Sequence, residues 1–398
     1  MKRTVSLLLL VLILMQFCSV CAVDTVTMYS LDGRQLEVNA AETEAYKNVG
    51  WFETYEEVTT TLYSTDGREL TVYKAEADAY KVLGWYESYE DVTTTLYSTD
   101  GKTMRVFKAE VEEYKASGWY ENYEDVITTL YSMDGRELTV YKAETDIYKA
   151  LGWYENYEDV VTVMCKKDGK QKKEVYKAEV ASYKNNGWVV MQSDAVDPDK
   201  PIVAITFDDG PRPESTTRIL NTLEFFNAKA TFFVVGWRAA KYPSLLKREN
   251  SIGCQIGNHT YSHPELTKVS TDKIKSEIAS TDKAVYSATG KYPAIIRPPY
   301  GSYSQTVLSV TDKPLILWSF DTLDWQYRNA DYIAKTVLSK VKDGDVILLH
   351  DIHDTTAAAT EKIVPELLAK GYQLVTVEEL AQHKKYNLAS HRAYTRFR

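Results

Sequence analysis

Four short apolar runs in the second half of the sequence end abruptly in polar residues that can do chemistry. They are Ile202–Phe207 before Asp208-Asp209, Ala294–Ile296 before Arg297, Leu315–Trp318 before Asp321 and Asp324, and Val346–Leu349 before His350-Asp351. A run that is apolar throughout is typical of a strand buried on both faces, as in a parallel sheet covered by helices. In such folds the carboxyl ends of the strands form the site. The pattern therefore predicts an enzyme with its site at that rim.

From Pro201 to about Leu380, such runs alternate with helical patterns. The predicted strands are Ile202–Phe207, Ala230–Val235, Ser251–Ile256, Ala294–Ile296, Leu315–Trp318, Val346–Leu349 and Tyr372–Val375. The predicted helices include Ser215–Phe226, Thr271–Tyr286, Ala330–Val341 and Thr360–Ala369. This alternation predicts an α/β domain with a parallel sheet. A set of about seven strands favours a barrel, complete or not, over a small open sheet.

The first half of the sequence is a repeat with a period of 34 residues. Asp-Gly recurs at Asp32-Gly33, Asp66-Gly67, Asp100-Gly101, Asp134-Gly135 and Asp168-Gly169, and Gly-Trp recurs from Gly50-Trp51 onward, with Gly187-Trp188 displaced by one residue. Strand formers on either side of Asp-Gly predict a hairpin, and helix formers closed by a glycine predict a short helix. The sequence thus predicts an α+β repeat region. The recurring tryptophan is expected to be buried between hairpin and helix, or between neighbouring units.

The chain begins with a segment typical of export. Lys2 and Arg3 precede the apolar stretch Leu7–Met15, and Val20-Cys21-Ala22 offers small residues for cleavage. The apolar stretch is shorter than the roughly 20 residues that span a bilayer, so a cleaved signal peptide is predicted, with no transmembrane segment afterwards. We therefore expect a secreted protein, and association with the cell wall is left open.

Cysteine usage and charge narrow the class further. The mature sequence retains Cys165 and Cys254, which fall in different predicted domains, so we expect two small buried thiols rather than a disulfide scaffold. The formal net charge of −9 argues against nucleic acid as the main partner.

The predicted organisation is a signal peptide at 1–22, five repeats at 23–193, a linker at 194–200, a catalytic domain at 201–383 and a basic tail at 384–398. The tail carries Lys384, Lys385, Arg392, Arg396 and Arg398 and no acidic residue. We expect it to be a solvated or frayed end, with contact to an anionic surface as the alternative.

Two histidines four residues apart, His259 and His263, suggest a metal site. On a helix this spacing places both rings on one face, but Pro264 disfavours a helical conformation at His263, which predicts a turn or the start of a helix. Asp208 or Asp209 could supply a third ligand from the first strand end. Two histidines and one carboxylate, with a position left for water, form a catalytic metal set.

The remaining strand-end residues can supply an acid and a base. Adjacent aspartates at the end of a strand point in different directions, so the one that does not bind metal could act as a general base. His350 could be the general acid for a leaving amine, which requires a carboxylate neighbour to keep the imidazole protonated. Asp324 and Asp351 are both candidates for that neighbour. Together these groups supply the roles of metal-assisted hydrolysis.

Five motifs occur in order along this half: Thr206-Phe207-Asp208-Asp209-Gly210, His259-Thr260-Tyr261-Ser262-His263, Arg297-Pro298-Pro299-Tyr300-Gly301, Asp321-Thr322-Leu323-Asp324-Trp325 and Leu348-Leu349-His350. The region from about Pro201 to Leu380 thereby resembles the polysaccharide deacetylases of carbohydrate esterase family 4, whose shared region is the NodB homology domain. The resemblance implies a distorted (β/α) barrel. The repeats look similar to modules next to catalytic domains on the surface of Gram-positive bacteria.

The resemblance also implies a role for each motif residue. Asp208 would be the general base held by Arg297, His350 the general acid tuned by Asp324, and the Tyr300 backbone N–H a donor to the oxyanion. Asp209, His259 and His263 would bind a divalent metal, with zinc expected and cobalt or another divalent ion as alternatives. Trp325 and Leu348 would line the pocket for the acetyl methyl group, or else serve only as core residues.

The leading hypothesis is a secreted, metal-dependent N-deacetylase that acts on N-acetylglucosamine in a cell-wall glycan, with peptidoglycan as the expected polysaccharide. Deacetylation of acetylxylan or chitin is the alternative within enzymes. A wall-attachment or spacer protein, in which the repeats are the function, is the alternative of another class. For the repeats themselves, a scaffold is favoured over glycan binding because burial is the simplest use of the recurring tryptophan.

Overall fold

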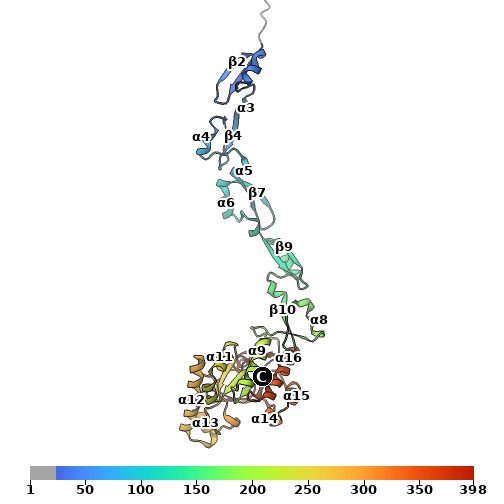
Figure 1. Ribbon diagram of the computed structural model, residues 1–398, viewed down its shortest axis with the longest axis vertical. Coiled ribbons are helices and arrows are strands. Elements are labelled where there is room, and N and C mark those ends of the chain that lie inside the picture. Colours follow the sequence, from blue (N-terminus) through green and yellow to red (C-terminus); the bar gives the residue numbers. More distant parts are fainter. Residues whose placement is uncertain (1–23) are drawn as a thin grey trace, which may run out of the picture. The chain divides into compact units, whose positions relative to one another are not determined.

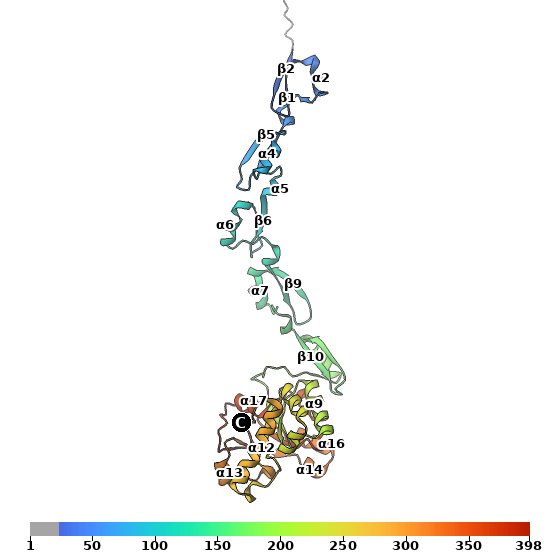
Figure 2. The ribbon, with the colours of Figure 1, turned by 60° about the vertical axis from the view of Figure 1, so that its left-hand side comes forward.

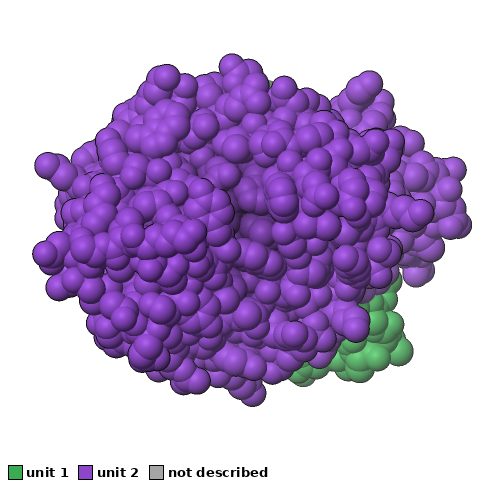
Figure 3. Space-filling view, turned by 90° about the horizontal axis from the view of Figure 1, so that it is seen from below, with its two compact units in different colours: residues 1–130, 137–155 green, residues 131–136, 156–398 purple. Residues whose placement is uncertain are grey.

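In the computed structural model, residues 24–398 are described; the predicted signal peptide lies outside the described residues. No helix in this range is long and apolar enough to cross a membrane. The chain divides into two compact units, coloured in Figure 3. The first comprises residues up to Leu130 together with Glu137–Glu155, and the second comprises Tyr131–Arg136 and Asn156–Arg398. The fifth repeat therefore belongs to the same unit as the predicted catalytic part.

Each repeat in the first unit forms an antiparallel hairpin followed by a short helix. The strands are β1 (Thr25–Ser30), β2 (Gln35–Asn39), β3 (Trp51–Phe52), β4 (Thr59–Tyr63), β5 (Glu69–Tyr73), β6 (Thr93–Tyr97), β7 (Thr103–Phe107), β8 (Ile127–Tyr131) and β9 (Glu137–Tyr141). The helices are α2 (Thr43–Lys47), α3 (Tyr55–Val58), α4 (Ala77–Val82), α5 (Tyr89–Val92), α6 (Val111–Ala116) and α7 (Thr145–Ala150). Each repeat buries few apolar side chains: the core of the second repeat consists of Leu62, Val72 and Ala77.

The recurring tryptophans are partly exposed, which corrects the expectation that they are buried. Trp85 packs against the small core of its repeat, but Arg68 covers the indole from the solvent side, with its guanidinium carbon 5.7 Å from the ring centre. A core of three small apolar side chains cannot enclose so large a ring on all sides.

Neighbouring repeats of the first unit are joined through their Asp-Gly turns. The Ala75 N–H donates to the carbonyl of Leu31, 3.2 Å away, and the same bond recurs one and two periods later at Ala109 and Ala143. Gly33 has φ +91°, and a Cβ on it would lie 2.8 Å from the ring of Tyr73 in the next repeat. The turn thus closes one hairpin and receives the aromatic ring of the following repeat.

The fifth repeat is part of the core of the second unit. Its strands β10 (Val161–Lys166), β11 (Lys172–Tyr176) and β12 (Trp188–Val190) form a sheet in the order β11-β10-β12, beside helix α8 (Val180–Asn185). Cys165 and Val189 lie in one buried apolar cluster with residues of the catalytic part. The buried Gln192 side chain donates to the Leu374 carbonyl and accepts from its N–H, at 2.8 and 2.7 Å. The repeat is therefore packed against the catalytic part.

The centre of the second unit is a parallel sheet. Its strand order is β15 (Gln255–Asn258), β14 (Thr231–Val234), β13 (Ile202–Asp208), β18 (Val346–His350) and β17 (Phe320–Asp321), and β19 (Gln373–Leu374) pairs with the start of β13. Single parallel bridges join Asn258 to Ile296 and Ile296 to Leu315, in β16 (Leu315–Ile316). All seven residues of β13 are buried, as expected for a strand covered on both faces.

Helices surround these strands (Figures 1 and 2). They are α9 (Pro213–Phe226), α10 (Gly236–Lys241), α11 (Pro243–Ser251), α12 (Thr271–Thr289), α13 (Gln305–Val310), α14 (Asp324–Tyr327), α15 (Ala330–Lys340), α16 (Asp354–Ala369) and α17 (Val377–His383). The mixed α/β class is confirmed, while closure into a distorted barrel stays a prediction. Cys165 and Cys254 are both buried free thiols, as predicted, but they share one unit.

Two of the expected elements differ from the structure. Ser251 ends helix α11, and the chain turns at Gly253, with φ +80°, so the strand predicted from Ser251 begins at Gln255. The basic tail is packed rather than frayed: β20 (Ala393–Tyr394) pairs with β16, and the Phe397 side chain is fully buried. The apolar Tyr394 and Phe397 anchor the tail despite its charge.

Candidate active site

The sheet register brings the proposed base and acid to one rim. β13 and β18 are parallel, and Asp208 pairs directly with His350 at their carboxyl ends. The neighbouring ends of β14 and β15 pair Val234 with Asn258, which places His259 at the same rim. A pocket of about 450 Å³ opens there. It is lined by Asp208, Asp209, His259, His263, Tyr300, Trp318, Asp321, Trp325, Arg328, Leu348, His350, Ile352 and His353. The face of the second unit in Figure 3 is hollowed near its middle.

Asp209, His259 and His263 form a candidate metal centre. Asp209 Oδ1 lies 3.5 Å from His259 Nε2 and 3.2 Å from His263 Nε2. Ligands bound to one zinc ion at about 2.0–2.2 Å in a tetrahedron would be separated by similar distances. No other group of three or more histidine, cysteine or acidic side chains within residues 24–398 is close enough to hold an ion. The donor set thus fits a divalent ion.

Hydrogen bonds prepare these ligands for a metal. His259 Nδ1 lies 2.7 Å from the Arg297 carbonyl oxygen, so this nitrogen carries the proton and Nε2 is left as the ligand atom. The Asp209 carboxyl is largely buried, which by itself would raise its pKa. The adjacent imidazoles of His259 and His263 outweigh burial and lower that pKa. The carboxylate is therefore ionised, as a ligand must be.

Asp208 is held by a fully buried arginine. Arg297 Nη1 donates to Asp208 Oδ1 at 2.7 Å and to the Thr206 hydroxyl at 2.7 Å. Its other nitrogens donate to the carbonyls of Ile316 and Leu317, and the guanidinium carbon lies 4.1 Å from the centre of the Phe233 ring. The arginine thereby fixes Asp208 Oδ1 and leaves Oδ2 for the pocket.

Asp324, rather than Asp351, is the carboxylate partner of His350. His350 Nδ1 lies 2.7 Å from Asp324 Oδ1, and Oδ2 accepts from the His350 N–H and the Thr356 hydroxyl. Burial lowers the pKa of His350, but the Asp324 hydrogen bond and the charges of Asp324, Asp208 and Asp209 outweigh it and raise the pKa to about 9. A divalent ion bound to Asp209 would offset the negative charge of that carboxylate. Asp324 would then remain the main group that raises the pKa of His350.

Asp351 is buried behind the site and does not bond His350. The Thr216 hydroxyl donates to its Oδ2, and its backbone carbonyl accepts from the Ser215 hydroxyl. Burial, opposed by the Thr216 hydrogen bond, raises the pKa of this carboxyl to about 7.

Several site residues have a left-handed backbone without being glycine. Asp209, His263 and Tyr300 have φ values of 74°, 61° and 61°. Of the two predicted alternatives at His263, a turn or the start of a helix, the left-handed backbone excludes the start of a helix. Such conformations cost about 1–3 kcal/mol each and persist where the surrounding structure holds them. Here the strain aims the side chains at one point: the ring centres of His259 and His263 are 4.9 Å apart, and Tyr300 packs on His263.

Strand β18 and the segments that follow β17 and β18 also line the pocket. Leu348 is buried, whereas Trp325 is half exposed, and its indole N–H donates to Asp321 Oδ2 at 3.2 Å. Both line the pocket, as expected. Arg328 and His353 also line it. Sequence reasoning did not single out Arg328, because nothing in the local pattern distinguishes it from a solvated surface arginine.

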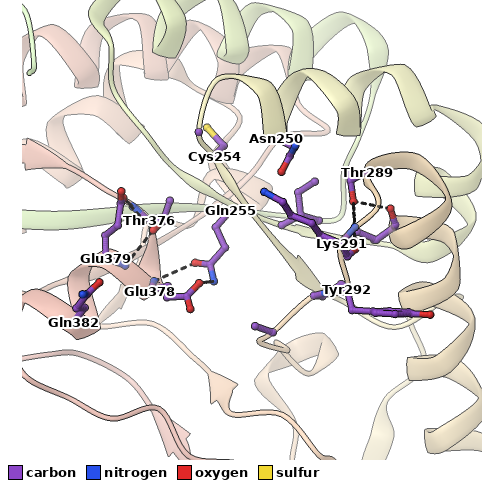
Figure 4. A pocket seen from close by; sticks show the side chains of 15 residues that line it. Asn250, Cys254, Gln255, Thr289, Lys291, Tyr292, Thr376, Glu378, Glu379 and Gln382 are labelled. Carbon is purple, nitrogen blue, oxygen red and sulfur yellow. Dashed lines mark hydrogen bonds between the residues drawn. The ribbon is translucent and has the colours of Figure 1, made fainter. Parts of the chain in front are cut away.

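A second pocket, of about 370 Å³, lies beside Gln255 at the amino end of β15, the end remote from the candidate ligands (Figure 4). Its polar groups largely satisfy one another: Gln255 Oε1 accepts from the Glu378 N–H, and Glu379 Oε2 accepts from the N–H and the hydroxyl of Thr376. It holds none of the candidate ligands, so the chemistry is assigned to the first pocket.

A model of the polysaccharide deacetylase family matches residues 195–314. Peptidoglycan-N-acetylglucosamine deacetylase PgdA of Listeria monocytogenes is 46% identical over 182 residues, covering 46% of this chain and 39% of that protein. Peptidoglycan-N-acetylmuramic acid deacetylase PdaC of Bacillus subtilis is 40% identical over 194 residues, covering 49% of this chain and 42% of that protein. The solved structure of PdaC gives a TM-score of 0.47, covering 48% of this chain and 94% of that one.

A shorter relative, a peptidoglycan-N-acetylglucosamine deacetylase of Bacillus cereus, is 38% identical over 191 residues, covering 46% of this chain and 89% of that protein. The chain thus spans less than half the length of PgdA and PdaC but most of the shorter relative.

Proposed function

Because this chain belongs to the polysaccharide deacetylase family, we propose that it is a secreted, metal-dependent N-deacetylase of a cell-wall glycan. The chain is thereby a hydrolase of the carbohydrate esterase family 4 type, acting on carbon–nitrogen bonds other than peptide bonds. The observation that carries the proposal is the convergence on one pocket of the candidate metal ligands, the arginine-held Asp208 and the carboxylate-paired His350.

In the proposed reaction, water adds to the acetamide carbonyl carbon and the carbon–nitrogen bond breaks. Asp208, held by Arg297, takes a proton from the attacking water. His350 gives its proton to the departing nitrogen, so the products are acetate and a free amine on the sugar. With a pKa of about 9, His350 is protonated at neutral pH and available as the acid.

Asp209, His259 and His263 would hold a divalent ion, expected to be zinc, which would supply Lewis acidity to activate water and polarise a carbonyl. The Tyr300 backbone N–H is proposed to donate to the developing oxyanion. Trp325 and Leu348 are proposed to hold the acetyl methyl group, since they present apolar surface in the same pocket.

The proposed substrate is peptidoglycan, because PgdA, PdaC and the Bacillus cereus relative all carry that polysaccharide in their names. N-acetylglucosamine is the expected sugar and N-acetylmuramic acid is the alternative that PdaC suggests. Acetylxylan and chitin remain the competing substrates. We propose that the repeats act as a scaffold between the cell wall and the enzyme, with glycan binding by their half-exposed aromatic rings as the alternative.

The test is acetate release by residues 24–398 from peptidoglycan, N-acetylglucosamine oligomers and acetylxylan, first with a chelator and then with added zinc. Release that the chelator abolishes and zinc restores, from either glucosamine polymer, would support the proposal. Release from acetylxylan alone would reassign the substrate. A zinc-loaded protein that releases no acetate from any of the three would refute the activity.

A further inference from the structure

Arg328 is a positive charge in the pocket wall that the proposed reaction does not use. It lies at the carboxyl end of α14, with a left-handed backbone (φ 46°). It lines the same pocket as the candidate ligands and His350. Its side chain is partly exposed, so it can meet a substrate that enters from solvent.

Two hydrogen bonds hold the guanidinium in place. Arg328 Nε donates to the Trp325 carbonyl at 2.6 Å, and Nη1 donates to His353 Nδ1 at 2.7 Å. His353 must therefore be unprotonated at Nδ1. Burial, and then the positive charge of Arg328, lower the pKa of His353, which keeps the ring neutral and able to accept. The ring centres of His353 and His350 are 6.3 Å apart. The His353 ring therefore lies between the guanidinium of Arg328 and His350, the proposed acid.

Arg328 has no negative partner. Among residues 24–398, no carboxylate oxygen lies within 4 Å of its guanidinium nitrogens, because none of the ion pairs involves it. The contrast with other arginines near the site is clear: Arg297 pairs with Asp208 and Arg212 pairs with Glu214 and Asp354. Nη2 and the second hydrogen of Nη1 are thus left for a ligand, and a guanidinium fork prefers a carboxylate.

We propose that Arg328 binds a carboxylate of the glycan near the N-acetyl group that is hydrolysed, and so selects peptidoglycan over neutral polymers. The inference rests on the proposed function. N-acetylmuramic acid carries a lactyl carboxyl on its sugar ring, and its peptide, where present, carries further carboxylates. Chitin and acetylxylan backbones carry none. The carboxylate is therefore the group that would distinguish these substrates at a cationic pocket wall.

The experiment compares Arg328→Gln with the wild type, using zinc-loaded residues 24–398. The substrates are neutral N-acetylglucosamine oligomers, glycan strands stripped of peptide so that the lactyl carboxylates are free, and strands that keep their peptides. On the anionic strands, KM should rise about tenfold or more, since a hydrogen bond to a charged group contributes roughly 1.5–3 kcal/mol. On the neutral oligomers, kcat and KM should both stay unchanged. Arg328→Lys should retain part of the preference.

Two controls separate recognition from structure. Arg218→Gln removes the same charge from helix α9, where Arg218 pairs with Glu361 and does not line the pocket, and should leave all three substrates unaffected. Added salt should weaken wild-type binding of the anionic strands and have little effect on Arg328→Gln. A rise in KM confined to stripped strands would identify the lactyl carboxylate as the group that Arg328 binds. A rise confined to peptide-bearing strands would identify a carboxylate of the peptide. Either result would support a carboxylate subsite.

Equal losses on neutral and anionic substrates would overturn the inference and make Arg328 a positioning residue for Trp325 and His353. Unchanged kinetics on every substrate would overturn it as well. A zinc-loaded wild type that releases no acetate from any substrate would instead refute the proposed function, and this result is visible before any variant is compared.

Discussion

The repeats of the first unit and the site of the second use left-handed backbone in opposite ways. In the repeats, every residue with positive φ among the described positions is a glycine, such as Gly33, Gly67 and Gly84. At the site, Asp209, His263 and Tyr300 take the same conformation with full side chains. Glycine adopts it without steric cost, whereas other residues pay about 1–3 kcal/mol. At Asp209 and His263, the proposed role as a metal ligand accounts for a side chain that is kept despite that cost.

The largest expected effect comes from removing a candidate ligand at one of these strained positions. Asp209→Asn or His263→Ala should lose bound zinc and acetate release together, by roughly 1,000-fold or more, because Lewis acidity contributes several kcal/mol. Metal content and turnover are measured on the same preparation. Thr260, with φ 63° and no place among the proposed ligands, offers a control: Thr260→Gly should keep zinc. Full activity in a metal-free Asp209→Asn protein would contradict the metal role.

Substitution of the proposed general acid, His350, should lower turnover without loss of bound metal. His350→Ala is expected to keep zinc and lose about 100- to 10,000-fold in kcat, the usual share of a general acid. Asp324→Asn removes the hydrogen bond and charge that hold the pKa of His350 near 9. The alkaline limb of the pH–rate profile should therefore move to lower pH, since the imidazole loses its proton earlier. Asp351→Asn, which changes a carboxyl that does not bond His350, should leave the limb in place. A limb that moves only in Asp351→Asn would reverse this assignment.

The sequence was sufficient to predict which residues meet at the site where their position depends only on being at the end of a strand. Asp208, His259 and His350 follow apolar runs, and parallel strands bring such positions together. Strand-end position alone did not decide between Asp324 and Asp351, although the family resemblance implied Asp324, because the choice depends on how the chain turns at Leu323, which has φ 57°. That conformation is set by tertiary contacts rather than by local propensity.

Two features of the packing could not be predicted from local sequence patterns. The burial of Phe397 depends on a sheet pairing between β20 and β16, which are far apart in the sequence. The packing of the fifth repeat depends on Gln192 reaching Leu374. The Asp-Gly of the fifth repeat keeps the period of 34 residues, and the displacement of Gly187-Trp188 by one residue does not indicate which core the repeat joins.

That packing predicts a stability difference inside the second unit. Residues 195–398 lack Cys165, Val189 and Gln192 and should melt roughly 5 °C or more below residues 156–398, because they expose apolar surface and leave the Leu374 backbone unpaired. Thermal unfolding followed by circular dichroism measures this. Gln192→Ala in residues 24–398 should reproduce part of the loss. Equal melting temperatures for the two fragments would mean that the fifth repeat adds nothing to the catalytic core.

The smallest effect is expected in the first unit, where two glycines share a conformation but not their surroundings. Gly67 and Gly84 have φ +85° and +87°, yet a Cβ on Gly67 would lie 2.8 Å from the Phe107 ring, whereas one on Gly84 would meet open space. Alanine therefore brings the same backbone strain at both positions, and a clash between repeats only at Gly67.

The local readout is hydrogen exchange at the Ala109 amide, which donates to Thr65 of the preceding repeat. Gly67→Ala should speed this exchange by about tenfold or more relative to Gly84→Ala, since overpacking costs about 1–3 kcal/mol. Both variants should keep wild-type acetate release, because neither residue touches the second unit's pocket. Equal exchange in the two variants would show that the Asp-Gly turn only closes its own hairpin. The rings of the following repeats would then contribute nothing to holding the array together.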